Sequence, residues 1–265
     1  MRTHWLWCFG AGLLAWPVFV GATPMEWLLT PLSGSADHHV ASWTYWHARW
    51  MVLGWGILLP TGALVARFFK VTPRQDWPRQ LDNKTWWHAH RALQYGGVAA
   101  MSVGVLLAWG MGGRGSLAAQ VHAWLGWGLC AAGWLQLASG LARGSKGGPT
   151  DQRLRGDHYD MTPWRIGFEH MHKLLGWAAM AVAVVVIVLG LLVADAPRWM
   201  LLVLGLWWLG FATLFALWQR QGRCMDTYQA IWGPDESHPG NRRASTVGGS
   251  RRYTAQEWAR RFGPW

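Results

Sequence analysis

The chain has 265 residues, of which 52% are hydrophobic and 14% are charged, compared with roughly 25% charged residues in a typical soluble domain. The chain contains 24 Trp and 33 Gly. A soluble protein of this size could not bury so much apolar surface. The net charge of +11 does not indicate nucleic-acid binding, because membrane proteins gather Lys and Arg in their cytoplasmic loops. The composition predicts an all-α integral membrane protein, and it excludes a disordered chain and a disulfide scaffold.

Residues 1–22 have the pattern of a secretory signal peptide. Arg2 precedes an apolar run that ends in small residues at Ala22. The same run is long enough to form a retained first transmembrane helix instead. We favour the signal peptide, and both interpretations leave residues 23–43 as a periplasmic segment.

A helix needs about 20 apolar residues to cross a ~30 Å hydrocarbon core, and several later stretches of the chain are this long. They are residues 44–69, 87–110, 119–142, 171–194 and 198–218. Together they predict a multi-pass membrane domain over 44–218 and a basic tail over 219–265. We expect this tail to be poorly ordered up to residue 253. Beyond it, we expect Tyr253, Trp258 and Phe262 to lie on the anionic inner membrane surface.

The connecting segments alternate between many and few Lys and Arg residues. They are numerous in 67–84, 143–170 and the tail, and rare or missing in 23–46, 111–118 and 194–198. The positive-inside rule therefore places the basic segments and the C-terminus in the cytoplasm. With the signal-like start, this orientation predicts a bacterial inner-membrane protein.

A histidine lies near the start of each of the first four apolar stretches: His47, His90, His122 and His172. Ionisable side chains at membrane depth are candidates for function. Because consecutive spans run antiparallel, His47 and His122 should lie near the outer surface, and His90 and His172 near the inner surface. The spacing predicts two histidine pairs at opposite ends of an antiparallel four-helix core, with the fifth stretch as a peripheral helix.

Two facing imidazoles suit a haem iron better than a zinc ion. Zinc takes four protein ligands, or three and a water, whereas these pairs offer two each and no nearby Cys. A haem iron takes one axial ligand on each face of its macrocycle, so the sequence predicts two bis-histidine haem groups. His88 and His170 lie two residues before His90 and His172, about 200° around the helix, and are not expected to be ligands.

Small residues at the +4 or +7 position from each histidine would leave room for a flat macrocycle. They are Gly54, Gly97, Gly126 and Gly176. Close packing of helices is the alternative explanation, and we favour haem binding because the offset recurs in all four stretches. Arg49, Arg91 and Lys173 follow the ligands closely and are candidates to hold haem propionates, although interfacial snorkelling explains them equally well.

The residues around these histidines resemble the cytochrome b561 superfamily, in particular the membrane half of its DOMON-linked, ferric-chelate-reductase-like branch. Trp46–Met51 leading to Leu59–Lys70 resembles the first core helix of that family. The other ligand motifs follow in the family's order: His90–Gln94, His122 with Gly126 and Gln136, and His172–Gly176. The resemblance covers about residues 43–218.

This resemblance implies two haem b groups, held by the pairs His47/His122 and His90/His172. It implies an oxidoreductase that moves single electrons across the membrane, with ascorbate, a quinol, a ferric chelate or a redox protein as candidate donor or acceptor. Because only residues 23–43 precede the first helix after the leader, we expect no DOMON domain, and any outer partner is then a separate molecule.

Two other functions remain open. One is a quinol-linked membrane cytochrome b subunit of a larger respiratory complex, which is also compatible with an oligomer. The other is a histidine-lined metal or proton transporter, which needs polar groups through the middle of its spans. The apolar run from Val182 to Gly190 disfavours the transporter.

Overall fold

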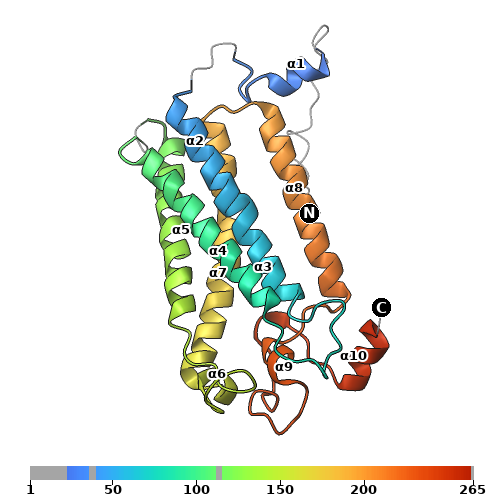
Figure 1. Ribbon diagram of the computed structural model, residues 1–265. Helices are drawn as coiled ribbons and strands as arrows, with labels where there is room; N and C mark the ends of the chain where they lie inside the picture. The colour runs from blue at the N-terminus through green and yellow to red at the C-terminus, as the bar shows by residue number, and fades with distance from the viewer. Residues whose placement is uncertain (1–22, 36–39, 112–114, 264–265) are drawn as a thin grey trace, which may run out of the picture.

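A computed structural model of the protein describes residues 23–35, 40–111 and 115–263. The predicted leader, residues 1–22, lies outside this part of the chain. The described residues form helices joined by loops (Figure 1). These helices are α1 (Pro24–Leu29), α2 (Ser42–Met51), the π-helix η1 (Val52–Leu58), α3 (Leu59–Phe68), α4 (Thr85–Ala108), α5 (Leu117–Leu141), α6 (Asp157–Asp160), α7 (Pro163–Val193), α8 (Arg198–Arg220), α9 (Thr227–Trp232), the 3-10 helix η2 (Val247–Gly249) and α10 (Ala255–Phe262).

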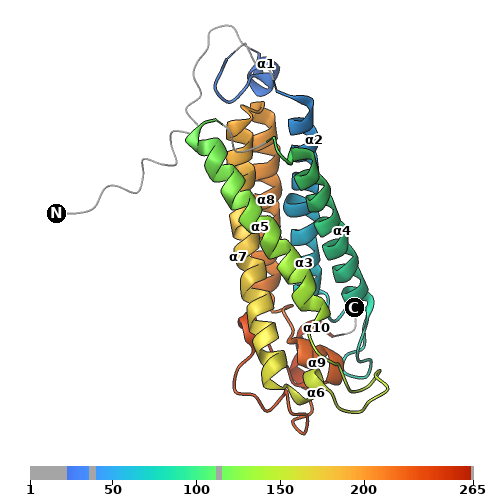
Figure 2. The ribbon, with the colours of Figure 1, turned by 90° about the vertical axis from the view of Figure 1, so that its left-hand side faces the viewer.

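The predicted antiparallel four-helix core is present. α2, η1 and α3 form one continuous helical rod that packs along α4, and α5 packs along α7 (Figures 1 and 2). Apolar side chains from the rod, α4, α5 and α7 meet in the middle of the bundle, among them Trp55, Met101, Leu129 and Ala183. This buried cluster separates the two ends of the bundle, which we call the outer end (His47 and His122) and the inner end (His90 and His172) after the orientation expected from the sequence.

The helices have the length and composition of membrane spans. Within the described ranges, Ser42–Phe68, Thr85–Ala108, Pro163–Val193 and Arg198–Arg220 are long and apolar enough to cross a membrane. α5 has 25 residues, but its Trp, Gly and Gln content lowers its mean hydropathy, and it is not among these four. The chain is therefore an all-α membrane protein in which α5 runs beside the apolar helix α7.

α7 begins earlier than its apolar pattern suggests. The predicted stretch starts at residue 171, whereas the helix starts at Pro163, and the Thr162 side chain accepts a hydrogen bond from the Arg165 backbone N–H at 3.3 Å. Arg165 and Glu169 in the added turns are each 6% exposed, so these turns are buried although they carry charges. Hydropathy alone places this boundary too late.

A proline explains the π-helix in the first rod. Pro60 has no N–H to offer to the carbonyl of Gly56, four residues earlier. Instead the Leu59 N–H bonds to Gly54 O, five residues back, and the freed Gly56 carbonyl accepts a 2.8 Å hydrogen bond from Trp207 Nε1. This bond fastens α8 to the four-helix core. α8 has no buried residue and is the predicted peripheral helix.

The residues after α8 fold against the inner end of the bundle, so the expectation of a poorly ordered tail is wrong. Every residue of α9 is buried. Tyr253 and Trp258 are also buried, and Trp258 packs edge-on against Trp77 with ring centroids 5.3 Å apart. These aromatic side chains therefore hold the C-terminal residues to the protein and do not lie on the membrane surface. We call residues 223–262 the C-terminal cap.

Candidate functional site

The structure brings His47 and His122 together at the outer end of the bundle. Their ring centroids are 6.2 Å apart and their planes are nearly perpendicular, at 84°. His47 Nδ1 is 2.9 Å from Gly104 O, and His122 Nδ1 is 3.0 Å from Val186 O. Each imidazole thus donates its Nδ1–H to a backbone carbonyl, which leaves Nε2 with its lone pair for another partner.

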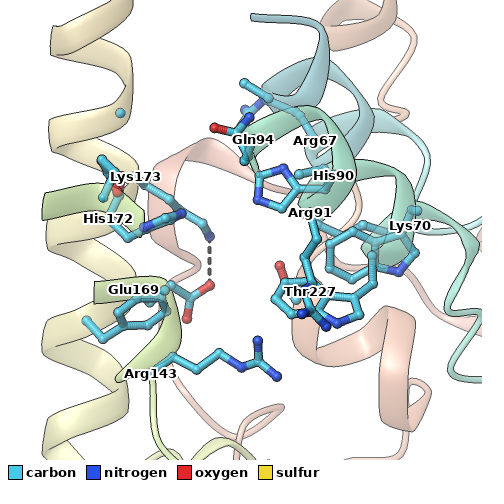
Figure 3. Close-up of a pocket in the computed structure, with 18 of the residues that line it drawn as sticks. Arg67, Lys70, His90, Arg91, Gln94, Arg143, Glu169, His172, Lys173 and Thr227 are labelled. Atoms are coloured by element: carbon cyan, nitrogen blue, oxygen red, sulfur yellow. Dashed lines mark hydrogen bonds and ion pairs between the residues drawn. The ribbon is translucent and has the colours of Figure 1, made fainter. Parts of the chain in front are cut away.

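His90 and His172 form a matching pair at the inner end. Both line one cavity of about 760 Å³, and they face each other from α4 and α7 (Figure 3). His90 Nδ1 is 2.9 Å from Gly62 O, while His172 Nδ1 lies 3.5 Å from the Ser139 hydroxyl. The cavity volume is within the roughly 300–1,000 Å³ of small-molecule and cofactor sites.

These pairs fit a group that takes two axial nitrogen ligands. Two metal–imidazole bonds of about 2 Å, together with the two ring radii, separate the centroids by about 6 Å. The outer pair has this separation. No cluster of three or more His, Cys, Asp or Glu side chains suited to a metal ion occurs in the described ranges, so each site offers two imidazoles.

The inner cavity contains polar atoms that lack a partner in the protein. Trp55 Nε1, Gln136 Oε1 and Arg165 Nε are buried without a hydrogen bond, and all three residues line the cavity. Buried polar groups are nearly always hydrogen-bonded in native proteins. A bound group that carries donors, acceptors or a π-face would provide these partners, so the residues present fit a cofactor.

The four glycines chosen from the sequence have different surroundings. A Cβ atom on Gly54 would lie 2.8 Å from Gly97 O, and a Cβ on Gly97 would lie 2.7 Å from two Leu59 carbons. Close helix packing therefore explains these two glycines. Gly176 lines the inner cavity, and a Cβ on Gly126 would meet nothing within 4 Å. A Cβ on Gly176 would lie 3.3 Å from Gln136 Nε2, so only Gly126 leaves open space beside its helix.

The three cations proposed for propionates are also placed differently. Arg91 lines the inner cavity and lies over the ring of Trp87. Lys173 lines it as well, but its ammonium donates to Glu169 at 2.7 Å and to the Val247 carbonyl at 3.1 Å (Figure 3). Arg49 is exposed and lies over Trp46 at 4.9 Å. Of the three, Arg91 has the position that best suits an anion at the cavity.

Arg143 is a cavity residue that the sequence pattern did not single out. Arg143 enters from the loop after α5 and lies 4.2 Å from the centroid of the Trp87 ring. Burial and the nearby Arg91 lower the pKa of Arg143 below its usual range. Gln94 donates to Leu59 O at 3.0 Å, and Gln136 donates to His172 O at 2.8 Å. Of these residues, only Gln94 and Gln136 were indicated by the sequence, because they belong to the motifs that resemble cytochrome b561.

His88 and His170 take the exposed positions expected of them. His170 is exposed on α7 and does not line the cavity, whereas His88 is exposed at the cavity mouth. Neither is part of the two histidine pairs.

Gly190 controls the space around His122 and was not foreseen. A Cβ atom on Gly190 would lie 2.8 Å from His122 Cε1 and 3.4 Å from its Nδ1. The imidazole therefore packs directly against the backbone of α7, one turn after the Val186 carbonyl that it binds. No offset from a ligand on its own helix marks this glycine.

We expect Gly190→Ala to displace the His122 imidazole and weaken cofactor binding at the outer pair alone. Alanine otherwise favours a helix by about 1 kcal/mol over glycine, so the fold itself should not suffer. Gly205→Ala on α8, where a Cβ meets nothing within 4 Å, is the control. The measurement is cofactor content after purification. Equal content in both variants would refute the role of Gly190.

The C-terminal cap closes the inner end of the cavity. Lys70 Nζ donates to Met225 O at 2.9 Å, and Arg67 donates to Gly248 O at 2.8 Å and to Gly249 O at 3.2 Å. Cap residues Thr227 and Ser250 line the cavity. Cations from α3 and the residues after it are therefore bound by carbonyls of the cap.

Burial lowers the pKa of Lys70 from its usual 10.5 to about 7, with the nearby Lys173 acting in the same direction. Between about pH 7 and pH 10.5, Lys70 therefore keeps its proton in the unfolded chain but has released it in the folded protein. Stability should therefore rise as the pH increases from about 7 towards 10.5, and this gain is missing below pH 7.

Thermal unfolding followed by circular dichroism across this pH range tests this expectation. Lys70→Met should flatten the rise, whereas Lys84→Met, at an exposed position before α4, should retain it. A rise of the same size in both variants would show that another group titrates.

The chain is similar in sequence to a plant protein. No family model matches the chain, and no solved structure matches it. It is 27% identical over 168 residues, or 63% of its length, to the cytochrome b561, DM13 and DOMON domain-containing protein of Arabidopsis thaliana. The chain spans 16% of that relative's length. This helical membrane protein is therefore similar, over more than half of its length, to a protein named for cytochrome b561.

Proposed function

We propose that this protein is a cytochrome b561-type oxidoreductase that carries single electrons across a membrane through two haem b groups. The observation that carries the proposal is the arrangement of the four histidines. Two imidazole pairs lie at opposite ends of one four-helix core, and three of the four Nδ1 atoms bind backbone carbonyls. The similarity to a cytochrome b561 protein supports the same conclusion.

In this proposal His47 and His122 hold the outer group, and His90 and His172 hold the inner group. The carbonyls of Gly104, Val186 and Gly62 fix the orientation of three rings, because a bonded Nδ1–H fixes both tautomer and ring angle. When bound, a bis-histidine haem supplies one-electron chemistry without an open axial position for oxygen.

Arg91 and Arg143 suit an anionic group at the inner cavity. Both guanidinium groups lie over the ring of Trp87, and Arg165 and Lys70 line the same cavity. Of the acids that line this cavity, Glu169 is bound to Lys173 and Asp82 is bound to Lys146. Haem propionates, or an anionic donor such as ascorbate, would complement the remaining positive charge. A quinol, a ferric chelate or a redox protein are the other candidate partners.

A metal or proton transporter finds less support in the same structure. The layer between the two pairs contains Trp55, Met101, Leu129 and Ala183, which are at most 5% exposed. These four side chains carry no charged or hydroxyl group that could pass an ion along, whereas an electron needs none.

The absorption spectrum and haem content of the purified protein test the proposal. We expect two haem b per chain, spectra typical of bis-histidine ligation when reduced by dithionite, and no change on adding carbon monoxide, since both axial positions are filled. Absence of haem, or a carbon-monoxide-sensitive spectrum at both sites, would contradict the proposal.

We further propose a bacterial inner membrane location with the C-terminus in the cytoplasm. Gly115 precedes α5 at one end of the bundle, and the C-terminal cap lies at the other (Figure 1). Reporter enzymes inserted at Gly115 and fused after residue 265 should therefore report opposite sides, periplasmic and cytoplasmic. Identical locations for the two reporters would refute this topology.

A further inference from the structure

Trp55 lies in the layer that separates the two histidine pairs. It follows His47 by eight residues and precedes Gly62, the partner of His90, by seven. At a rise of 1.5 Å per residue, it is about 12 Å from the level of His47 and about 10 Å from the level of His90. The indole is therefore midway between the two sites along the bundle axis.

The contacts of Trp55 fix its ring in this layer. A Cβ atom on Gly133 would lie 3.2 Å from Trp55 Cζ2 and 3.0 Å from Met101 Sδ, so the indole and the thioether pack against the bare backbone of α5. Trp55 is 5% exposed and Met101 is 0% exposed. The position of the ring is therefore set by α4, α5 and η1 together.

The polar edge of the Trp55 ring is its indole N–H. Its Nε1–H is buried without a hydrogen-bond partner, although Trp55 is one of the residues that line the inner cavity. Buried indole N–H groups usually find a partner. If Trp55 only filled space in the core, a leucine would serve there without this cost of burying a donor.

We infer that the indole of Trp55 is the contact between the two haem sites: its N–H faces the group bound in the inner cavity, and its ring carries the electronic coupling towards the outer pair. This inference rests on the proposed function. With both groups bound, one electron would pass from the reduced group at one site to the oxidised group at the other. No bond forms or breaks, no proton moves, and the indole ends unchanged.

Two substitutions distinguish the role of the aromatic ring from the role of its N–H. Trp55→Leu removes both, and Trp55→Phe retains an aromatic ring without the donor. Trp134→Leu is the matched control, because Trp134 follows Gly133 on the same level of α5 but is 52% exposed. Haem content, absorption bands and midpoint potentials are measured first, and then the two-phase reduction after a reductant is added on one side of reconstituted vesicles.

We expect Trp55→Leu to keep both haem groups and to slow the second phase, transfer between the sites, by about tenfold, which is a change of about 1.4 kcal/mol in the barrier. Trp55→Phe should retain the rate but shift the absorption band and potential of the inner haem only. Trp134→Leu should match the unmodified protein in every measurement.

A second phase as fast in Trp55→Leu as in the unmodified protein would overturn the inference and leave the proposed function intact. If Trp55→Leu loses the inner haem, Trp55→Phe decides: an inner haem with unchanged band and potential overturns the inference. Absence of haem from the unmodified protein would overturn the proposed function itself.

Discussion

His122→Leu is expected to empty the outer site and leave the inner haem with an almost unchanged spectrum, so that about half of the bound haem is lost. The physical reason is that a haem b with one axial imidazole is poorly retained, while His90 and His172 lie on the other two helices of the core. His90→Leu should have the reverse effect. Electron transfer across the membrane should cease in both variants, because each interrupts the route at one end.

The matched controls for these variants are His88→Leu and His170→Leu. Both residues are exposed and lie two positions from a proposed ligand, so haem content and spectrum should remain intact. Haem quantification and low-temperature spectra of all four variants distinguish the sites. If His122→Leu and His90→Leu removed the same haem, the assignment of ligand pairs would be wrong.

Removal of the C-terminal cap should have a comparably large effect, confined to the inner site. A chain that ends at Gly222 loses the carbonyls of Met225, Gly248 and Gly249, which bind Lys70 and Arg67. Lys70 would be left beside the cavity without its carbonyl partner, Arg67 would keep only its hydrogen bonds to Gln219, and the inner end of the cavity would open to water. We expect loss of the inner haem, with a retained outer haem.

The outer haem serves as the internal control for this truncation, because it reports whether the bundle itself is intact. A second truncation after Phe262 keeps the whole cap and should behave as the full chain. Spectra of the two truncated proteins, compared with His90→Leu, identify which haem is lost. Retention of the inner haem without the cap would contradict the role that we assign to these residues.

The pairing of histidines could be predicted because it depends on local order alone. Antiparallel succession of four helices places His47 level with His122, and His90 level with His172, whatever the details of packing. The peripheral position of α8 could be predicted in the same way, because it has no histidine and its sequence is apolar on all sides.

Contacts between residues far apart in the chain could not be predicted from periodicity. Gly190 matters because it faces His122 on another helix, 68 positions earlier in the chain. The π-helix arises from the missing N–H of Pro60, but its stabilisation by Trp207 depends on where α8 packs. The C-terminal cap has few apolar runs, and it is held by side-chain hydrogen bonds to backbone carbonyls, which leave no periodic signal.

The two histidine pairs are proposed to form one electron route across the membrane. The most direct test uses vesicles that contain the purified protein and enclose ferricyanide, with ascorbate added outside. We predict that the enclosed ferricyanide is bleached at a rate proportional to the amount of protein, and that His122→Leu and His90→Leu abolish this bleaching. Reduction of the haem groups without any loss of the enclosed ferricyanide would contradict this electron route.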